Sequence, residues 1–184
     1  MGQARRHTGR DRLVTLHARI THLEMRERPS ARMAMPHGQR VALMRARQMP
    51  LSFYRYLYRE VGKPHHWLLR RQTSDGELAE AIHAPTTRID VLYVDGCPAG
   101  FYELDLARLP GEAEILYFGL MPEFQGRGLA KFFLSEAIHA GWDSEPEKLV
   151  IHTNTLDSPR ALQLYQRMGF APYGYDEEIV EPWV

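Results

Sequence analysis

The sequence has little cysteine, no long hydrophobic run and no net charge. Its one cysteine, Cys97, excludes a framework of disulfide bonds and a metal site built from several cysteines. A membrane-spanning helix needs about 20 consecutive, mostly apolar residues, and no such run occurs, so we expect no membrane span. The basic N-terminal segment lacks the apolar stretch of a secretion signal, so a cytoplasmic location is expected.

Length and composition favour one folded domain. The 184 residues, 44% of them hydrophobic, are enough to bury a substantial core, and the chain is short for a two-domain protein. We expect a disordered basic extension over residues 1–12 and a single domain over residues 13–184. The sequence contains no internal repeat and no low-complexity tract.

Charge is unevenly distributed along the chain. Residues 1–50 hold 11 Lys or Arg against 3 Asp or Glu, whereas the remainder holds 12 against 20. A basic arm can bind nucleic acid. However, no aromatic residue precedes Phe53, so stacking on bases has little support. A solvated extension is the favoured interpretation, and nucleic acid is an unlikely partner.

Apolar spacing and turn residues predict strands that alternate with helices in the second half of the chain. Pro50 opens a helical stretch that ends near Gly62, and Ser74 and Glu77 have the spacing of a capping box. Asp95-Gly96 is a hairpin signal. Strand–helix–strand order predicts a parallel pair within a mixed sheet. The expected strands are residues 14–20, 89–94, 101–106, 112–120 and 148–153.

The most informative segment is a glycine loop between a strand and a helix, within residues 116–142. Such a loop presents unpaired backbone N–H groups and the positive end of the helix dipole, which together form an anion site. An ordinary turn into a helix is the alternative interpretation for a Gly-x-Gly pair. The loop lacks the third glycine of a dinucleotide fingerprint and the Gly-Lys-Ser/Thr of a P-loop.

The pattern Gln125-x-x-Gly128-x-Ala130 resembles the Q/R-x-x-G-x-G/A motif of the GNAT superfamily of N-acetyltransferases. The resemblance implies that the loop amides bind the pyrophosphate of acetyl-CoA, with added charge from Arg127. It also implies that backbone groups near Phe118 and Leu120 pair with the pantetheine arm. The residues implied to bind the pyrophosphate are Gln125, Gly126, Arg127, Gly128, Leu129 and Ala130.

The same resemblance implies a fold. It is an α/β fold with a central twisted mixed sheet of about six to seven strands, flanked by helices. The sheet is splayed between the fourth and fifth strands, which correspond to residues 112–120 and 148–153. Members of this superfamily commonly dimerise, so a homodimer is a possible state.

A second motif follows the last expected strand. From the residues alone, Tyr165 is a core aromatic on a helix that begins near Ser158, and its hydroxyl needs a polar partner. The pattern Ala161-x-x-x-Tyr165-x-x-x-Gly-Phe resembles the GNAT motif in which tyrosine protonates the leaving CoA thiolate. Ser158 stands where the family often has asparagine. Asn154 is expected to share that cofactor contact, and a loop-capping role for Asn154 is the alternative.

Glu114 is the candidate general base. Strict alternation would place it on one strand face with Leu116, Phe118 and Leu120, where partial desolvation would raise its pKa. A lysine-like amine has a pKa of about 10.4 and must lose a proton before it attacks a thioester. A carboxylate with a raised pKa suits that step, and its position resembles that of the base in histone-type members. The alternative carboxylates are Glu112, Glu103 and Asp105.

The resemblance places the acceptor cleft beneath the aromatic-rich helix, with Tyr54, Tyr58, Trp67 and Glu103 as candidate contacts. The expected activity is transfer of an acetyl group from acetyl-CoA to a primary amine, by direct attack. Nearby carboxylates favour a cationic amine, and the acceptor's identity stays open. A non-catalytic acyl-CoA-binding regulatory module on the same fold is the alternative. No metal site is expected, because no ligand pattern supports one.

Overall fold

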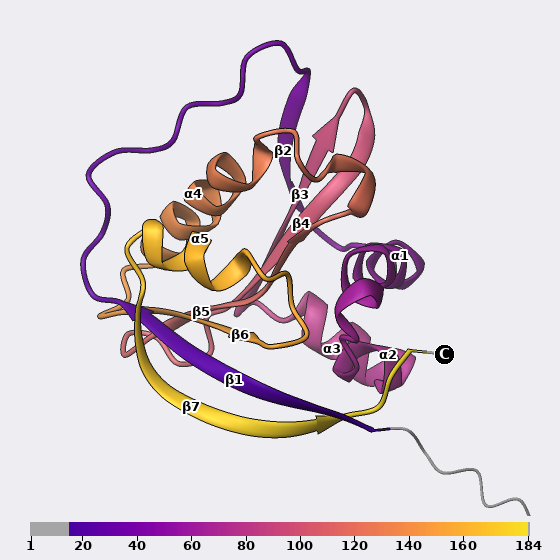
Figure 1. The fold of residues 1–184 in the computed structure, drawn as a ribbon. Coiled ribbons are helices and arrows are strands. Elements are labelled where there is room, and N and C mark those ends of the chain that lie inside the picture. The colour runs from indigo at the N-terminus through magenta and orange to yellow at the C-terminus, as the bar shows by residue number, and fades with distance from the viewer. Residues whose placement is uncertain (1–14, 184) are drawn as a thin grey trace, which may run out of the picture.

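A computed structural model describes residues 15–183, which form one open mixed sheet with helices on both faces (Figure 1). The expected extension over residues 1–12 lies outside the described residues, as does Val14. The strands are β1 (Leu16–Met25), β2 (Val41–Ala46), β3 (Thr87–Val94), β4 (Cys97–Asp105), β5 (Ala113–Leu120), β6 (Leu149–Asn154) and β7 (Ala171–Val180). The α-helices are α1 (Leu51–Gly62), α2 (Leu69–Gln72), α3 (Asp75–His83), α4 (Leu129–Trp142) and α5 (Ala161–Arg167), and Lys63–His65 and Pro122–Phe124 form short 3-10 turns.

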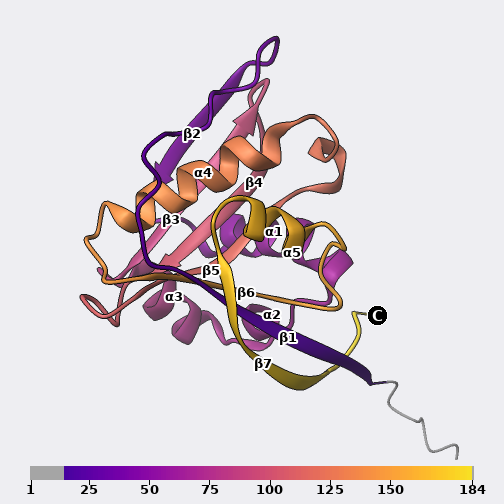
Figure 2. The same cartoon turned by 60° about the vertical axis from the view of Figure 1, so that its left-hand side comes forward.

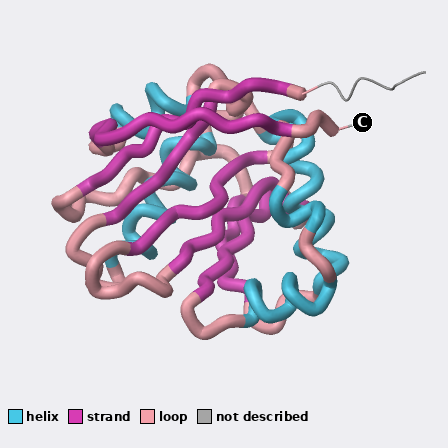
Figure 3. Tube along the Cα trace, turned by 90° about the horizontal axis from the view of Figure 1, so that it is seen from below, coloured by secondary structure: helices cyan, strands magenta, loops and turns pink. Residues whose placement is uncertain are grey.

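The sheet has the strand order β2-β3-β4-β5-β6-β1-β7 within the described residues. Neighbours run antiparallel except β5 and β6, which are parallel and joined by the crossover helix α4. The predicted parallel pair inside a mixed sheet is therefore confirmed. The first strand, β1, lies between β6 and the last strand, β7, and Figure 3 shows these two long strands side by side.

The two parallel strands separate part-way along their length. Register partners join them over three positions only, Ala113–Ile115 with Leu149–Ile151. Beyond Ile115, the edge of β5 that faces β6 has no recorded partner among the described residues. The predicted splay between these strands is confirmed, and it leaves backbone groups free along an opening in the sheet.

Helices cover both faces of the sheet and enclose two apolar clusters. Figure 2 shows α4 in front of the strands, with α1 and α3 behind them. On the α4 side, Phe133 packs against the rings of Tyr102 and Phe118. On the α1 side, Tyr54 packs against Phe101 in the second cluster, which also includes Leu57. A packed apolar cluster therefore lies on each face of the sheet, on both sides of the opening between β5 and β6.

A β-bulge in β5 changes which residues share a face. Glu103 pairs with Tyr117 and Leu104 pairs with Ile115, so Leu116 is the extra residue. Cross-strand partners point to the same face, which places Glu114 with Tyr117 rather than with Phe118. The predicted common face for Glu114, Leu116, Phe118 and Leu120 is wrong, because the bulge shifts the alternation by one residue.

Local turn and cap predictions agree with the structure. Ser74 and Glu77 form the expected capping box at the start of α3. Asp95 and Gly96 both have positive φ, at 51° and 82°, as the predicted hairpin turn requires.

The start of the last helix differs from the prediction, because this helix begins at Ala161 rather than near Ser158. Within residues 15–183, no helix is both long and apolar enough to cross a bilayer.

Candidate functional site

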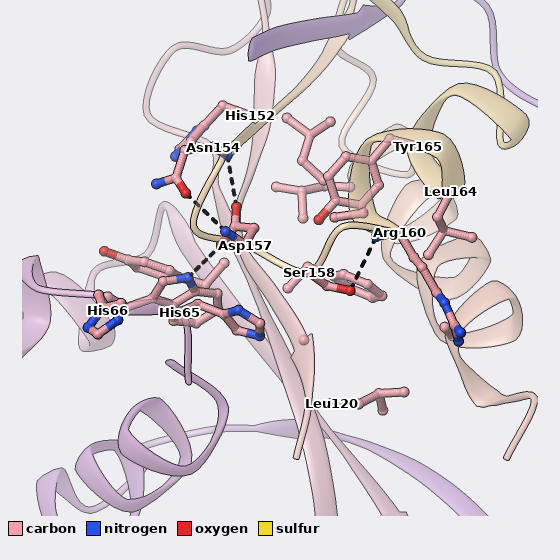
Figure 4. Close-up of a pocket in the computed structure, with 18 of the residues that line it drawn as sticks. His65, His66, Leu120, His152, Asn154, Asp157, Ser158, Arg160, Leu164 and Tyr165 are labelled. Carbon is pink, nitrogen blue, oxygen red and sulfur yellow. Dashed lines mark hydrogen bonds between the residues drawn. The ribbon is translucent and has the colours of Figure 1, made fainter. Parts of the chain in front are cut away.

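The splay between β5 and β6 opens into a cavity of about 1010 Å³ (Figure 4). Its walls come from β5, the start of α4, the β6–α5 segment, the segment between α1 and α2, and the end of β7. Most of the predicted site residues line it. These are Tyr58, Trp67, Phe118, Leu120, Gln125, Gly126, Gly128, Leu129, Ala130, Asn154, Ser158 and Tyr165. Four predicted residues do not line it, namely Tyr54, Glu103, Glu114 and Arg127.

The glycine loop has the geometry of an anion cradle. Gly126 and Gly128 have φ of +74° and +76°, the left-handed region that side chains other than glycine rarely adopt. A Cβ built on either glycine would meet no atom within 4 Å, so both face open space. Gly128 is the N-cap of the 14-residue helix α4, with no side-chain cap. The first N–H groups of α4 are thus available to a bound anion.

Gln125 fixes the shape of this loop. Its side-chain amide donates a hydrogen bond to the Leu120 carbonyl at 3.1 Å, which ties the loop to the end of β5. The guanidinium of Arg127 lies over the Phe124 ring, 4.9 Å from its centroid, and Arg127 does not line the cavity. Arg127 can therefore add long-range charge, but its side chain is not positioned as a direct contact.

Two cations from outside the glycine loop also belong to the cavity lining. Lys131, in the first turn of α4, and Arg160, immediately before α5, both line the cavity. They approach it from separate elements, as expected for a site that holds a multiply charged anion. The sequence prediction missed Arg160, although its place just before a helix next to the cofactor motif was a usable signal.

Tyr165 is the buried tyrosine that the second motif predicts. It is 6% exposed, lines the cavity, and packs edge-on against Phe118 and Phe170. Figure 4 shows its hydroxyl directed toward the cavity. Burial, with a smaller effect of the Asp157 charge, raises the pKa of Tyr165 above its ordinary value of 10.0. The hydroxyl is therefore protonated at neutral pH and able to donate a proton.

The side chain of Asn154 organises the loop after β6. Its oxygen accepts hydrogen bonds from the N–H groups of Leu156 and Asp157, at 2.8 and 3.1 Å, and its amide donates to Glu178. The structure thus has the loop-capping role that was the alternative for this residue. Ser158 also lines the cavity, and its hydroxyl accepts a 3.4 Å hydrogen bond from the Arg160 N–H.

Glu114 lies one hydrogen bond away from the cavity. Its carboxylate contacts Arg108 Nη2 at 2.6 Å and His152 Nδ1 at 3.2 Å. Burial raises the pKa of Glu114, but His152 and Arg108 outweigh it and hold the pKa below its ordinary value. The expectation of a raised pKa is wrong, because it considered desolvation without these two partners. His152, which the sequence prediction missed, does line the cavity.

The part of the cavity lined by Tyr58, Tyr117 and residues 65–69, where the sequence predicts the acceptor, is here called the acceptor end. It is aromatic and rich in histidine. The rings of Trp67, Tyr58 and Tyr117 pack against one another, and the Trp67 indole N–H donates to Asp157 at 3.2 Å. His65 and His66 precede Trp67 in the lining. Within residues 15–183, no group of three or more His, Cys, Asp or Glu side chains is arranged to hold a metal ion.

Glu103 and Tyr54 lie behind this end rather than in it. Glu103 is 1% exposed, pairs with Arg70 and accepts a hydrogen bond from the Tyr54 hydroxyl at 2.5 Å. Burial raises the pKa of Glu103, and Arg70 and Tyr54 offset part of that rise. Neither residue lines the cavity, so both support the wall of the acceptor end from inside the protein.

The segment after β7 also supports the acceptor end. The backbone N–H of Trp183 donates to His66 Nδ1 at 3.1 Å, and its indole N–H donates to the Trp67 carbonyl at 2.8 Å. Arg71 lies over the Trp183 ring at 4.7 Å. No spacing in the sequence signals these contacts, since they join residues that lie 116 and 117 positions apart.

The chain belongs to the GNAT family of acetyltransferases, because the model of that family matches residues 45–170. Solved structures share the fold. A GNAT-family acetyltransferase from Novosphingobium aromaticivorans has a TM-score of 0.61 and 16% identity, over 92% of this chain and 68% of that one. A functionally unknown protein from Staphylococcus epidermidis has a TM-score of 0.54 and 16% identity, over 92% of this chain and 64% of that one.

A third structure, an aminoglycoside N-acetyltransferase in complex with CoA, has a TM-score of 0.54 and 18% identity, over 75% of this chain and 92% of that one. No curated protein matches the chain. These TM-scores show a shared fold. The present chain spans less than two thirds of the Staphylococcus protein.

Proposed function

We propose that the protein transfers the acetyl group of acetyl-CoA to a primary amine. The observation that carries the proposal is one continuous cavity, which reaches from the glycine loop through the splay to the aromatic acceptor end. A donor with a charged end and a long, narrow arm needs that combination of an anion cradle and a slot between strands.

The residues present fit acetyl-CoA. The pyrophosphate would lie at Gly126 and Gly128, with Lys131 and Arg160 beside it. The pantetheine amides would pair with the free edge of β5 near Phe118 and Leu120, as a short extra strand. The thioester would then lie near Tyr165, where the slot meets the acceptor end.

The reaction would proceed by direct attack. The amine nitrogen adds to the thioester carbonyl, and a backbone N–H near Leu120 stabilises the oxyanion. As the C–S bond breaks, Tyr165 gives its proton to the thiolate sulfur. The amine must also lose a proton, and Glu114 with its partner His152 is the group that we assign to this step.

The acceptor class is a primary amine on a small molecule or a peptide. Asp157 and Glu178 line the acceptor end, so a cationic amine is the favoured form. Glu103 adds nothing to this preference, because Arg70 neutralises it. A cytoplasmic location and a homodimer remain expectations of the proposal.

Calorimetric titration with acetyl-CoA, followed by a thiol-release assay, tests the function. The amine panel would contain lysine, spermidine, tyramine, an aminoglycoside and a peptide with a free N-terminal amine. Binding with turnover on one amine is the expected result. Binding without turnover on any amine would favour the acyl-CoA-binding regulatory module. Absence of binding would contradict both, since the glycine loop would then be an ordinary turn.

A further inference from the structure

The group that reaches the cavity is His152, not Glu114. His152 lines the cavity with 39% of its side chain exposed, whereas Glu114 is 16% exposed and lies behind it. The two belong to neighbouring parallel strands, β6 and β5, and meet through His152 Nδ1 and Glu114 Oε1 at 3.2 Å. The imidazole ring therefore connects the cavity with the Glu114 carboxylate through one hydrogen bond.

The tautomer of His152 follows from its partner. Glu114 also accepts a hydrogen bond from Arg108 at 2.6 Å, and both partners favour its ionised form. An ionised carboxylate can only accept hydrogen bonds, so the Nδ1 atom of His152 must carry the hydrogen. The Nε2 atom of the neutral ring then carries the lone pair.

We propose that His152 Nε2 accepts the proton of the attacking amine and that Glu114 is the residue that positions and polarises His152. This assignment rests on the proposed acetyl transfer and deepens it. In this arrangement the Glu114 carboxylate fixes the orientation of the His152 ring and stabilises its charged form.

The proposed reaction forms a C–N bond and breaks the C–S bond, and protons move through His152 and Tyr165. An amine that binds as the ammonium first loses one proton to solvent, which frees its lone pair. The neutral amine nitrogen then forms a bond to the acetyl carbon while one of its two remaining protons moves to His152 Nε2, which makes an imidazolium next to the Glu114 carboxylate. The C–S bond then breaks, and the thiolate takes the Tyr165 proton. Afterwards the imidazolium releases its proton to solvent, which reaches it because the ring is partly exposed, and Tyr165 regains a proton from solvent.

The surroundings of His152 determine the pH dependence. The hydrogen bond to Glu114 raises the pKa of His152 above its ordinary value, and the charges of Asp157 and Glu178 act in the same direction. On β1, His22 is its register partner, with ring centroids 6.2 Å apart, and Asp176 holds His22 at 2.8 Å. The base is active when neutral, so turnover falls as the pH drops through this raised pKa.

Profiles of kcat/KM against pH distinguish the two candidate bases. In the parent protein the acidic limb should lie above about pH 6.5. Glu114→Gln should move that limb to lower pH and leave part of the activity, because it removes the group that raises the histidine pKa. His152→Gln should remove the limb and lower kcat by about 100-fold or more, the usual contribution of a general base.

The opposite pattern would overturn the assignment: the limb disappears in Glu114→Gln and persists in His152→Gln. The matched control is His22→Gln, a neighbouring histidine that does not line the cavity, and it should keep the limb and the turnover of the parent. Acetyl-CoA titration of each variant verifies that the donor site is intact. A parent protein without acetyl-CoA binding or turnover would instead overturn the proposed function, and this assignment with it.

Discussion

Arg70 and Glu103 form an ion pair inside the protein, with 2.6 Å between Arg70 Nη2 and Glu103 Oε1 and side-chain exposures of 12% and 1%. The pair joins α2 to strand β4 of the sheet. It therefore connects the segment that lines the acceptor end to the sheet, and the Tyr54 hydroxyl completes the contact from α1.

Removal of one partner should lower the free energy of unfolding far more than removal of both. Glu103→Leu leaves the Arg70 guanidinium buried without a counter-charge, and we expect a loss of about 3–5 kcal/mol in the free energy of unfolding. The double variant with Arg70→Met should recover most of that loss. Urea unfolding of the three proteins measures it, and equal losses in the single and double variants would contradict the prediction.

Tyr165→Phe should separate binding from chemistry. The ring still fills its place beside Phe118, so acetyl-CoA affinity should change little, while loss of the proton donor should lower kcat by about 100-fold. Tyr173→Phe, at an exposed tyrosine of β7 that does not line the cavity, is the control. Unchanged kcat in Tyr165→Phe would remove Tyr165 from the reaction.

Arg160→Ala should weaken acetyl-CoA binding through lost charge. Because Arg160 is exposed, we expect a loss of about 1 kcal/mol, and the loss should shrink at high salt. Arg167→Ala, at the end of the helix that Arg160 precedes and outside the cavity lining, is the matched control. Calorimetry at low and high salt measures both, and equal effects of the two variants would show that only overall charge matters.

Gly128→Ala should lose more affinity than stability. A side chain at φ +76° costs about 1–2 kcal/mol of backbone strain, and its Cβ also enters the anion cradle. Gly96→Ala carries a similar backbone cost at φ +82°, in a hairpin that does not line the cavity. Thermal unfolding and acetyl-CoA titration of both variants test this, since only Gly128→Ala should lose affinity.

The pair of Glu114 and His152 should stabilise the fold most within a limited pH window. Burial raises the pKa of Glu114, but its partners lower it overall below the ordinary 4.5, so its contribution is lost as the pH falls through the folded value. Glu114 raises the pKa of His152 above the ordinary 6.5, so that contribution is lost as the pH rises through the folded value.

The difference in unfolding free energy between the parent and Glu114→Gln should therefore be largest between pH 4.5 and 6.5. Urea titrations from about pH 3 to about pH 9 measure it. A difference that does not vary with pH would mean that the pair contributes no linked protonation.

Features encoded by neighbouring residues were predictable from the sequence. The glycine loop, the capping box at Ser74 and the tyrosine helix each depend on residues a few positions apart, and their spacing indicates the local geometry. The parallel pair was predictable as well, because a strand, a helix and a strand follow one another.

Features that depend on distant partners were not predictable in this way. The sequence predicts a raised pKa for Glu114, because no neighbouring residue points to His152, which lies on another strand. It predicts an acceptor contact for Glu103, because Arg70 is remote from it in sequence. Leu116 has no feature that marks it as a bulge. Short, half-exposed β2 and acidic β7 lack the apolar alternation by which strands are recognised.

The position of β1 between β6 and β7 has a consequence for the order in which the protein matures. A ribosome completes β1 before the other strands of the described sheet, yet its partner strands β6 and β7 are the last two of that sheet to be made. Until then the strand has no edge to join, and ordering it requires closure of nearly the whole chain, a feature associated with slow folding. Strand β7 and the β6–α5 wall of the cavity, with Tyr165, are thus parts of the domain that a nascent chain assembles late.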